Sequence, residues 1–174
     1  MPVTEHMKQF LQGTPFFGGL NDGALDLLVS MLTERTFERG EVVFREGDTG
    51  ASMFILTQGE VLICRRGDSG IDVHLVRLRA GDFFGETTLI EMQPRPYVAR
   101  VDATAKLYEL TNRDLYRLYK ADIHAYVMVV QNINRELCRR LRRADVKLTE
   151  LADRDGDRQT QVHIPIGKRV VPTG

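Results

Sequence analysis

The residues of this chain best suited to binding a small anion lie between Gly81 and Arg95. This stretch, GDFFGETTLIEMQPR, has two glycine turns, two threonines after a Gly-Glu step, and an arginine behind a proline. The Gly85-Glu86 step predicts a turn into a short helix, whose first backbone N–H groups are unpaired and partly positive and can hold an anion. Arg95 returns in the same loop, and its planar guanidinium matches the paired oxygens of a phosphate.

Glu86 is expected to act differently, because a carboxylate repels phosphate but accepts hydrogen bonds from a sugar hydroxyl. An arginine for phosphate and a glutamate for a hydroxyl together describe a nucleotide site. A surface ion pair between Glu86 and Arg95, worth about 0–1 kcal/mol, accounts for the same two residues. On spacing alone the ion pair is the more economical explanation.

The segment Gly85–Ile90, with Pro94 and Arg95, resembles the phosphate-binding cassette of the cyclic nucleotide-binding domain family. That family includes the bacterial catabolite activator, the regulatory subunit of protein kinase A and cyclic nucleotide-gated channels. The stretches RGEVVFREGD, MFILTQGEV and LRAGDFFGE resemble strands and turns of the family's β-roll, so the resemblance covers roughly residues 14–150. It implies that a cyclic nucleotide sits with its phosphate on Arg95, its ribose hydroxyl on Glu86 and its base under a long C-terminal helix that closes as a lid.

The resemblance also gives a set of ligand-binding candidates. They are Phe84, Gly85, Glu86, Thr87, Thr88, Leu89, Arg95, Pro96, Tyr97 and, facing the base from the long helix, Asp145. Three features depart from the family pattern. Pro96 has no N–H where the family commonly uses one for phosphate, Tyr97 is bulky where a small or hydroxyl residue is usual, and Thr87-Thr88 replaces an apolar and a small residue.

Composition and patterning predict one compact domain with an appendage, or two very small domains. The chain has 174 residues, is 43% hydrophobic, and carries 24 basic and 24 acidic residues, so no global field attracts it to nucleic acid or anionic membrane. Short β runs separated by glycine turns predict a small barrel, sandwich or roll. With the resemblance, we predict an α+β fold: an antiparallel β-roll of the double-stranded β-helix or jelly-roll type, flanked by N-terminal helices and a long C-terminal helix.

The predicted organisation has four parts. A helical lead-in covers 1–35, and the roll covers 36–110 with the cassette at about 81–97. A short helix and a long dimerisation or lid helix cover 111–152, and the tail 153–174 is a candidate for disorder. Within the roll, separate strands are expected at 41–44, 53–56, 60–64, 72–78, 98–101 and 106–110.

The long helix carries apolar residues at alternating spacings of four and three, which is the heptad pattern of a coiled coil. The dimer-interface candidates are Val127, Val130, Asn134, Leu137, Leu141, Ala144 and Leu148. A seam of this length predicts a two-fold homodimer, with Asn134 setting the register. The alternative is that the seam covers the roll of its own chain. The nearby Arg139, Arg140, Arg142 and Arg143 are read as the polar side of this helix, since no aromatic stacking residues accompany them.

Several classes of function are disfavoured. The four histidines are scattered, so no metal site is expected, and the two cysteines, Cys64 and Cys138, fit no metal or redox spacing. No nucleophile–base pair indicates an enzyme. With no signal region and no apolar stretch of membrane-spanning length, we expect a cytoplasmic protein. The residues after the long helix are too few for the winged helix-turn-helix of the family's transcription factors, so no DNA-binding domain is expected.

Two hypotheses follow. The first is a stand-alone sensor that binds cAMP or cGMP, dimerises and signals to an unknown effector protein through helix rearrangement. The second is a degenerate, ligand-free relative whose roll and helix serve only dimerisation or protein–protein assembly. Asp145 could accept a hydrogen bond from a base amino group, but the residues do not select one nucleotide.

Overall fold

The computed structural model describes residues 5–67 and 72–155. The chain divides into two compact units, 1–136 and 137–174, which are described separately. Of the tail 153–174, predicted as a candidate for disorder, residues 153–155 end a helix and 156–174 lie outside the described residues.

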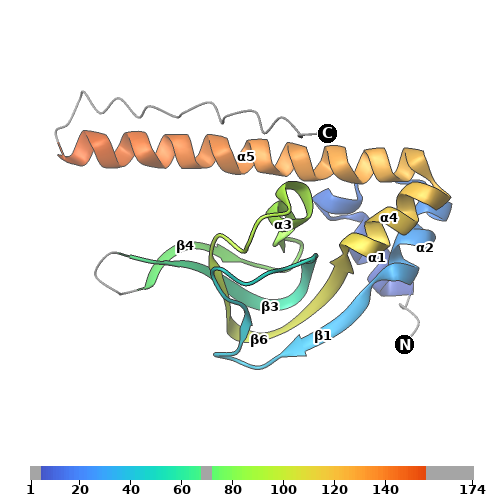
Figure 1. Cartoon of the computed structure of the whole chain (residues 1–174), viewed down its shortest axis with the longest axis horizontal. Helices are drawn as coiled ribbons and strands as arrows, with labels where there is room; N and C mark the ends of the chain where they lie inside the picture. The colour runs from blue at the N-terminus through green and yellow to red at the C-terminus, as the bar shows by residue number, and fades with distance from the viewer. Residues whose placement is uncertain (1–4, 68–71, 156–174) are drawn as a thin grey trace, which may run out of the picture. The chain divides into compact units, whose positions relative to one another are not determined.

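Six strands in the described part of the chain form one antiparallel, open sheet. They are β1 (Thr33–Phe37), β2 (Val42–Phe44), β3 (Ser52–Arg66), β4 (Asp72–Leu78), β5 (Phe83–Phe84) and β6 (Val98–Thr111). The order is β1-β6-β3-β4, with β2 paired to β6 and β5 paired to β3. The predicted antiparallel β-roll is therefore confirmed, as an open sheet and not a closed barrel (Figure 1).

The two longest strands correct the sequence prediction. Residues 53–56 and 60–64 were expected as two separate strands joined by a turn at Gly59. Residues 98–101 and 106–110 were also expected as two separate strands. Each pair forms one continuous strand, because β3 and β6 pair along their lengths and the register shifts around Gln58 and Glu60 absorb the irregularity. Gly59 adopts φ +87°, so it forms a bulge within a strand and does not end one.

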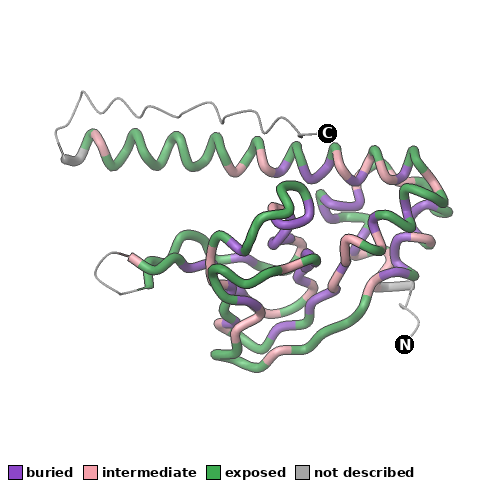
Figure 2. Tube along the Cα trace, in the orientation of Figure 1, coloured by how far each residue is buried: buried purple, intermediate pink, exposed green. Residues whose placement is uncertain are grey.

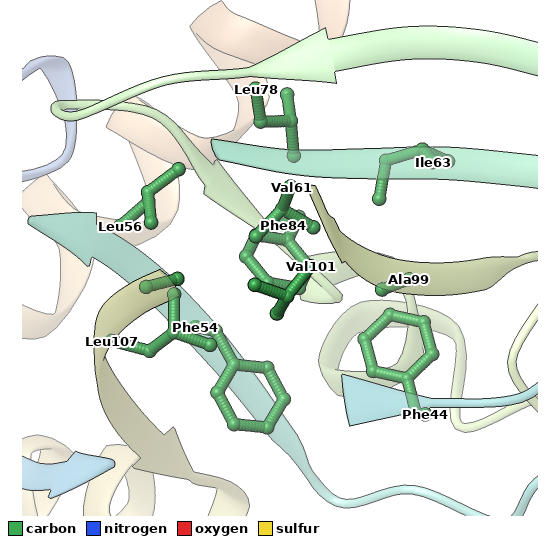
Figure 3. Packing of buried hydrophobic residues seen from close by; sticks show 11 residues of the cluster. Phe44, Phe54, Leu56, Val61, Ile63, Leu78, Phe84, Ala99, Val101 and Leu107 are labelled. Carbon is green, nitrogen blue, oxygen red and sulfur yellow. The ribbon is translucent and has the colours of Figure 1, made fainter. Parts of the chain in front are cut away.

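The core of the roll is made of apolar residues from β2, β3, β4, β5 and β6, shown in Figure 3. Three phenylalanine rings, Phe44, Phe54 and Phe84, lie 5.5–6.2 Å apart between centroids. Phe54 pairs with Phe84 across β3 and β5, so β5 brings the start of the cassette directly onto this core. Figure 2 shows the burial along the chain, and β3 is buried in two continuous runs on either side of Gly59.

The helices are α1 (Glu5–Gln12), the 3₁₀ turn η1 (Pro15–Phe17), α2 (Asp22–Met31), α3 (Glu86–Glu91), α4 (Asn112–Ala121) and α5 (Ile123–Asp155). Side-chain caps begin two of these helices. Asn21 accepts a hydrogen bond from the Ala24 N–H at 2.8 Å, and Thr111 forms a capping box with Asp114 at the start of α4. Helices α1, α2 and α4 gather at one end of the sheet (Figure 1).

The buried face of α5 in the first unit differs from the predicted seam. Ala125, Val129 and Ile133 are buried, with Asn132 among them. The seam residue Val127 is 45% exposed, Asn134 is exposed and Val130 is half-buried. In the second unit, Leu141 and Leu148 are 60% and 56% exposed, Ala144 is exposed and Leu137 is half-buried. The seam therefore does not supply the face that α5 buries in the first unit.

Asn132 joins α5 to the N-terminal turn, and its replacement is expected to destabilise the protein. Its Nδ2 donates to the carbonyls of Phe16 at 3.0 Å and Gly18 at 2.8 Å. Asn132→Ala leaves these acceptors without that donor and is expected to lower the free energy of unfolding by about 1–3 kcal/mol. Urea denaturation measures the loss. Gln131→Ala, an exposed change on the same helix, should stay within about 0.5 kcal/mol, and equal losses in both variants would contradict this role for Asn132.

Candidate functional site

The site begins where β5 turns into α3. Gly85 lies between them in the left-handed region at φ 80°, a conformation that favours glycine. A Cβ at Gly85 would also lie 2.7 Å from Nη1 of Arg95. Phe84 before it is fully buried, and Glu86 after it begins α3 at 1% exposure. The predicted turn into a short helix is confirmed, and it carries a buried carboxylate at its first position.

Arg95 is held in place by its own backbone. Its N–H donates to the carbonyl of Asp48, and its carbonyl accepts from the N–H of Gly47, both at 2.9 Å. The turn at 45–48 is itself closed by Asp48, whose carboxylate accepts from the Arg45 N–H at 2.7 Å. The backbone of Gly47 and Asp48, distant in sequence, thereby fixes Arg95 beside the loop that precedes β3.

The guanidinium of Arg95 lies inside the protein, 4% exposed, in a slot built from three segments. Nη1 donates to the carbonyl of Gly85 at 2.9 Å and to Oγ1 of Thr88 at 3.3 Å. Nη2 donates to the carbonyl of Ser52 at 2.6 Å and its hydroxyl at 3.4 Å. The Phe44 ring lies 4.2 Å from the guanidinium carbon, a cation–π contact.

Gly50 forms the remaining wall of this slot. A Cβ there would lie 2.3 Å from Nε of Arg95 and 2.6 Å from its guanidinium carbon. The slot therefore requires a residue without a side chain at position 50, as it does at position 85. Phe44, Gly50 and Ser52 were not predicted as site residues, because they lie more than forty residues before Arg95 and no local motif marks them.

Two polar atoms at this site are buried and have no hydrogen-bond partner within the described part of the chain. They are Nε of Arg95 and Oγ1 of Thr87. Burial lowers the pKa of Arg95 from its ordinary value, and the nearby Tyr97, Asp48, Glu109 and Glu86 act in the opposite sense. An arginine remains a cation even so. A buried cation with an unused N–H is an environment that an anion with several acceptor oxygens would complete, and α3 carries a further unused hydroxyl at Thr87.

The two residues after the arginine take different positions. Pro96 is exposed, whereas Tyr97 is half-buried with its ring 5.7 Å from that of Phe44. The Tyr97 hydroxyl accepts a hydrogen bond from the N–H of Gly85 at 3.3 Å. The Tyr97 hydroxyl is therefore already bonded to one of the backbone N–H groups that we expected to bind an anion.

The remaining candidates separate into two groups. Thr88 and Leu89 lie on α3 and are buried, at 3% and 6% exposure. The Thr88 hydroxyl accepts a hydrogen bond from the Arg95 guanidinium. Asp145 belongs to the second unit, in the later part of α5, and is exposed.

Among the described residues, no group of three or more His, Cys, Asp and Glu side chains could hold a metal ion. No helix in that part of the chain combines the length and apolarity needed to cross a bilayer.

Comparison with known proteins agrees with this geometry. Residues 34–122 match the family model of the cyclic nucleotide-binding domain. The cyclic AMP receptor protein of Thermus thermophilus is 31% identical over 82% of this chain, and a cAMP-dependent protein kinase regulatory subunit of Yarrowia lipolytica is 33% identical over 56%. A cyclic nucleotide-binding domain from Methylobacillus flagellatus superposes with a TM-score of 0.76 at 19% identity, over 84% of this chain and 82% of its own, which shows a shared fold.

The chain belongs to the cyclic nucleotide-binding domain family. The relatives named above are a receptor and a kinase regulatory subunit, not enzymes. The chain spans 64% of the length of the Thermus receptor and 25% of that of the Yarrowia subunit.

Proposed function

We propose that this chain is a sensor module that binds a cyclic nucleotide, cAMP or cGMP, at the cassette. The observation that carries the proposal is the buried guanidinium of Arg95, whose Nε has no partner in the described part of the chain, together with the unpartnered Oγ1 of Thr87 on α3. The cyclic phosphate would accept from these groups, and Glu86 would accept from the ribose hydroxyl. The free thiols of Cys64 and Cys138 suit the cytoplasm, where such a sensor would act.

Signalling would follow from a population shift. A nucleotide can move the helices only by binding one arrangement more tightly than the other. Asn132 would take part in this shift, because its side chain hydrogen-bonds α5 to the turn after α1. An effector protein would read the resulting arrangement.

Isothermal titration calorimetry of the purified chain with cAMP, cGMP and cyclic dinucleotides tests this function. Saturable binding of cAMP or cGMP at one site per chain supports it. If all these titrations are flat, the chain is a ligand-free relative that serves assembly. The specific observation that favours this second function is that both terminal nitrogens of Arg95 already donate to protein oxygens.

Tyr97→Phe is expected to tighten nucleotide binding. A phosphate that uses the Gly85 N–H must first displace the Tyr97 hydroxyl, which phenylalanine lacks. One neutral hydrogen bond contributes about 0.5–1.5 kcal/mol, so the dissociation constant should fall about two- to tenfold. Calorimetry measures the change, with Tyr116→Phe, an exposed tyrosine on α4, as the control. Weaker binding would mean that the hydroxyl contacts the ligand itself.

We also propose that the chain forms a homodimer through the exposed apolar seam of α5. Leu141 and Leu148 are 60% and 56% exposed on a helix whose apolar residues follow a heptad spacing. Isolated helices of this kind bury such residues by pairing, and each buried leucine contributes roughly 1.5–3 kcal/mol. The partner would be a second copy of the chain, aligned by Asn134.

Leu141→Glu combined with Leu148→Glu is therefore expected to convert a dimer into a monomer. Each helix of the dimer would then bring two carboxylates into the apolar seam, and burying these charged groups is unfavourable. Sedimentation velocity measures the mass of both forms. Val146→Glu, equally exposed at 60% but outside the heptad positions, is the matched control and should leave the dimer intact. A wild-type monomer would contradict the proposal.

A further inference from the structure

The end of α4 and the start of α5 carry a cluster of tyrosines that the nucleotide site does not use. Tyr116 and Tyr119 on α4 have ring centroids 6.2 Å apart, and Tyr119 packs edge-on against Tyr126 of α5 at 5.4 Å. Lys120 Nζ lies 5.5 Å from the Tyr116 ring and 5.6 Å from the Tyr119 ring. These four residues, Tyr116, Tyr119, Lys120 and Tyr126, are called the tyrosine ladder.

The ladder is open to solvent although its helix is anchored elsewhere. Helix α4 buries Leu115 and Leu118, whereas Tyr116 and Tyr119 are 59% and 41% exposed. Three of the five tyrosines of the chain lie in this ladder. Tyrosine is enriched at protein interfaces because its ring offers a large apolar area and its hydroxyl tolerates water.

The charges around the ladder are of one sign at the surface. Arg113 and Lys120 are exposed, and the Arg117 side chain is 61% exposed. Of the two carboxylates of this region, Asp114 caps α4 and also accepts from Nη1 of Arg117 at 3.3 Å, from a side chain only 15% exposed. Asp122 accepts from the Ala125 N–H at 2.9 Å. The surface therefore presents aromatic rings framed by cations.

We infer that the tyrosine ladder is a docking site for an acidic segment of another protein that carries apolar side chains. The apolar groups of such a segment would pack on the Tyr116 and Tyr119 rings, and its carboxylates would pair with Lys120 and Arg113, since Arg117 already pairs with Asp114. A protein is favoured over an anionic membrane, because polybasic membrane sites gather more cations than this surface presents. Helices α4 and α5 meet here at the end of the sheet opposite the β3–β4 hairpin, so the surface is separate from the cassette (Figure 1).

The test is a titration of the isotope-labelled full chain, followed by amide NMR, without any nucleotide. The probe is a synthetic peptide in which leucine and phenylalanine are spaced by glutamates. We expect saturable shifts confined to residues of α4 and the first turns of α5. Because no nucleotide is present, the result stands apart from the nucleotide proposal, which calorimetry tests separately.

Variants localise the binding. The double variant Tyr116→Ser and Tyr119→Ser should weaken peptide binding about tenfold, as expected for aromatic residues at the centre of an interface. Lys120→Glu should weaken it about two- to fivefold, the range for an exposed charge pair. Leu75→Ser, on β4 and 56% exposed, is the matched apolar control and should have no effect.

Several outcomes would overturn the inference. One is the absence of shifts in α4 and α5, and another is unchanged binding in the double tyrosine variant. Equal binding of a peptide with lysines in place of the glutamates would remove the charge argument. Shifts at the ladder caused instead by phosphatidylserine vesicles, by a single-stranded oligonucleotide, or by concentrating the chain alone would assign the surface to a membrane, a nucleic acid or a second copy.

Discussion

Arg95→Ala is expected to weaken cyclic nucleotide binding by about 2–5 kcal/mol, the usual loss when one partner of a buried charge pair is removed. The guanidinium is the buried cation of the cassette, and alanine leaves nothing there to neutralise a phosphate. Calorimetry of wild type and variant measures the difference. Arg100→Ala is the matched control, because Arg100 is a half-exposed arginine on β6 that pairs with Asp72 at 3.5 Å.

The alanine variant also loses the bonds from Arg95 to the carbonyls of Gly85 and Ser52, so its stability must be measured alongside. Gly50→Ala keeps the charge but moves it. Its new Cβ would lie 2.3 Å from Nε of Arg95, so the guanidinium must shift relative to the carbonyls of Gly85 and Ser52. We expect it to cost about 1.5–3 kcal/mol of binding, the range for hydrogen bonds to a charged group, and urea denaturation measures the accompanying loss of stability. Unchanged affinity in both variants would show that Arg95 serves only the fold.

Gly59→Ala is expected to destabilise the protein by about 2–5 kcal/mol, through backbone strain and overpacking together. The residue adopts φ +87°, and a Cβ would lie 2.2 Å from the carbonyl oxygen of Thr104 and 2.7 Å from that of Ala103. Both atoms are backbone of β6, so neither can yield without disturbing the β3–β6 pairing. Urea denaturation measures the loss as a shift in midpoint at unchanged slope.

Gly40→Ala provides the comparison for this prediction. Gly40 has a similar φ of +90°, but a Cβ there would meet nothing within 4 Å. Its replacement should therefore show only the strain of the left-handed backbone, about 1–2 kcal/mol. Equal losses at the two positions would mean that the approach of β6 to Gly59 contributes nothing.

Local chemistry explains which features could be predicted. The caps at Asn21 and Thr111, the glycine turn into α3 and the long α5 each depend on residues close together in sequence, and each is present in the structure. The antiparallel β-roll was predictable because short apolar runs and glycine turns recur along 36–110, and because the motifs resemble a known family. The nucleotide-binding residues and the heptad dimer remain predictions.

The chemistry of the cassette follows from residues close together in the chain: a turn without a side chain, a carboxylate at the start of a short helix, and an arginine returning in the same loop. The direction in which that arginine points depends instead on residues distant in sequence. Its slot is built by Phe44 from β2, Gly50 before β3 and the Ser52 carbonyl, and it exists only once these segments pack. Likewise, the merging of short runs into β3 and β6 depends on pairing between strands about forty residues apart, because backbone hydrogen bonds across a sheet outweigh the local preference of a glycine to turn.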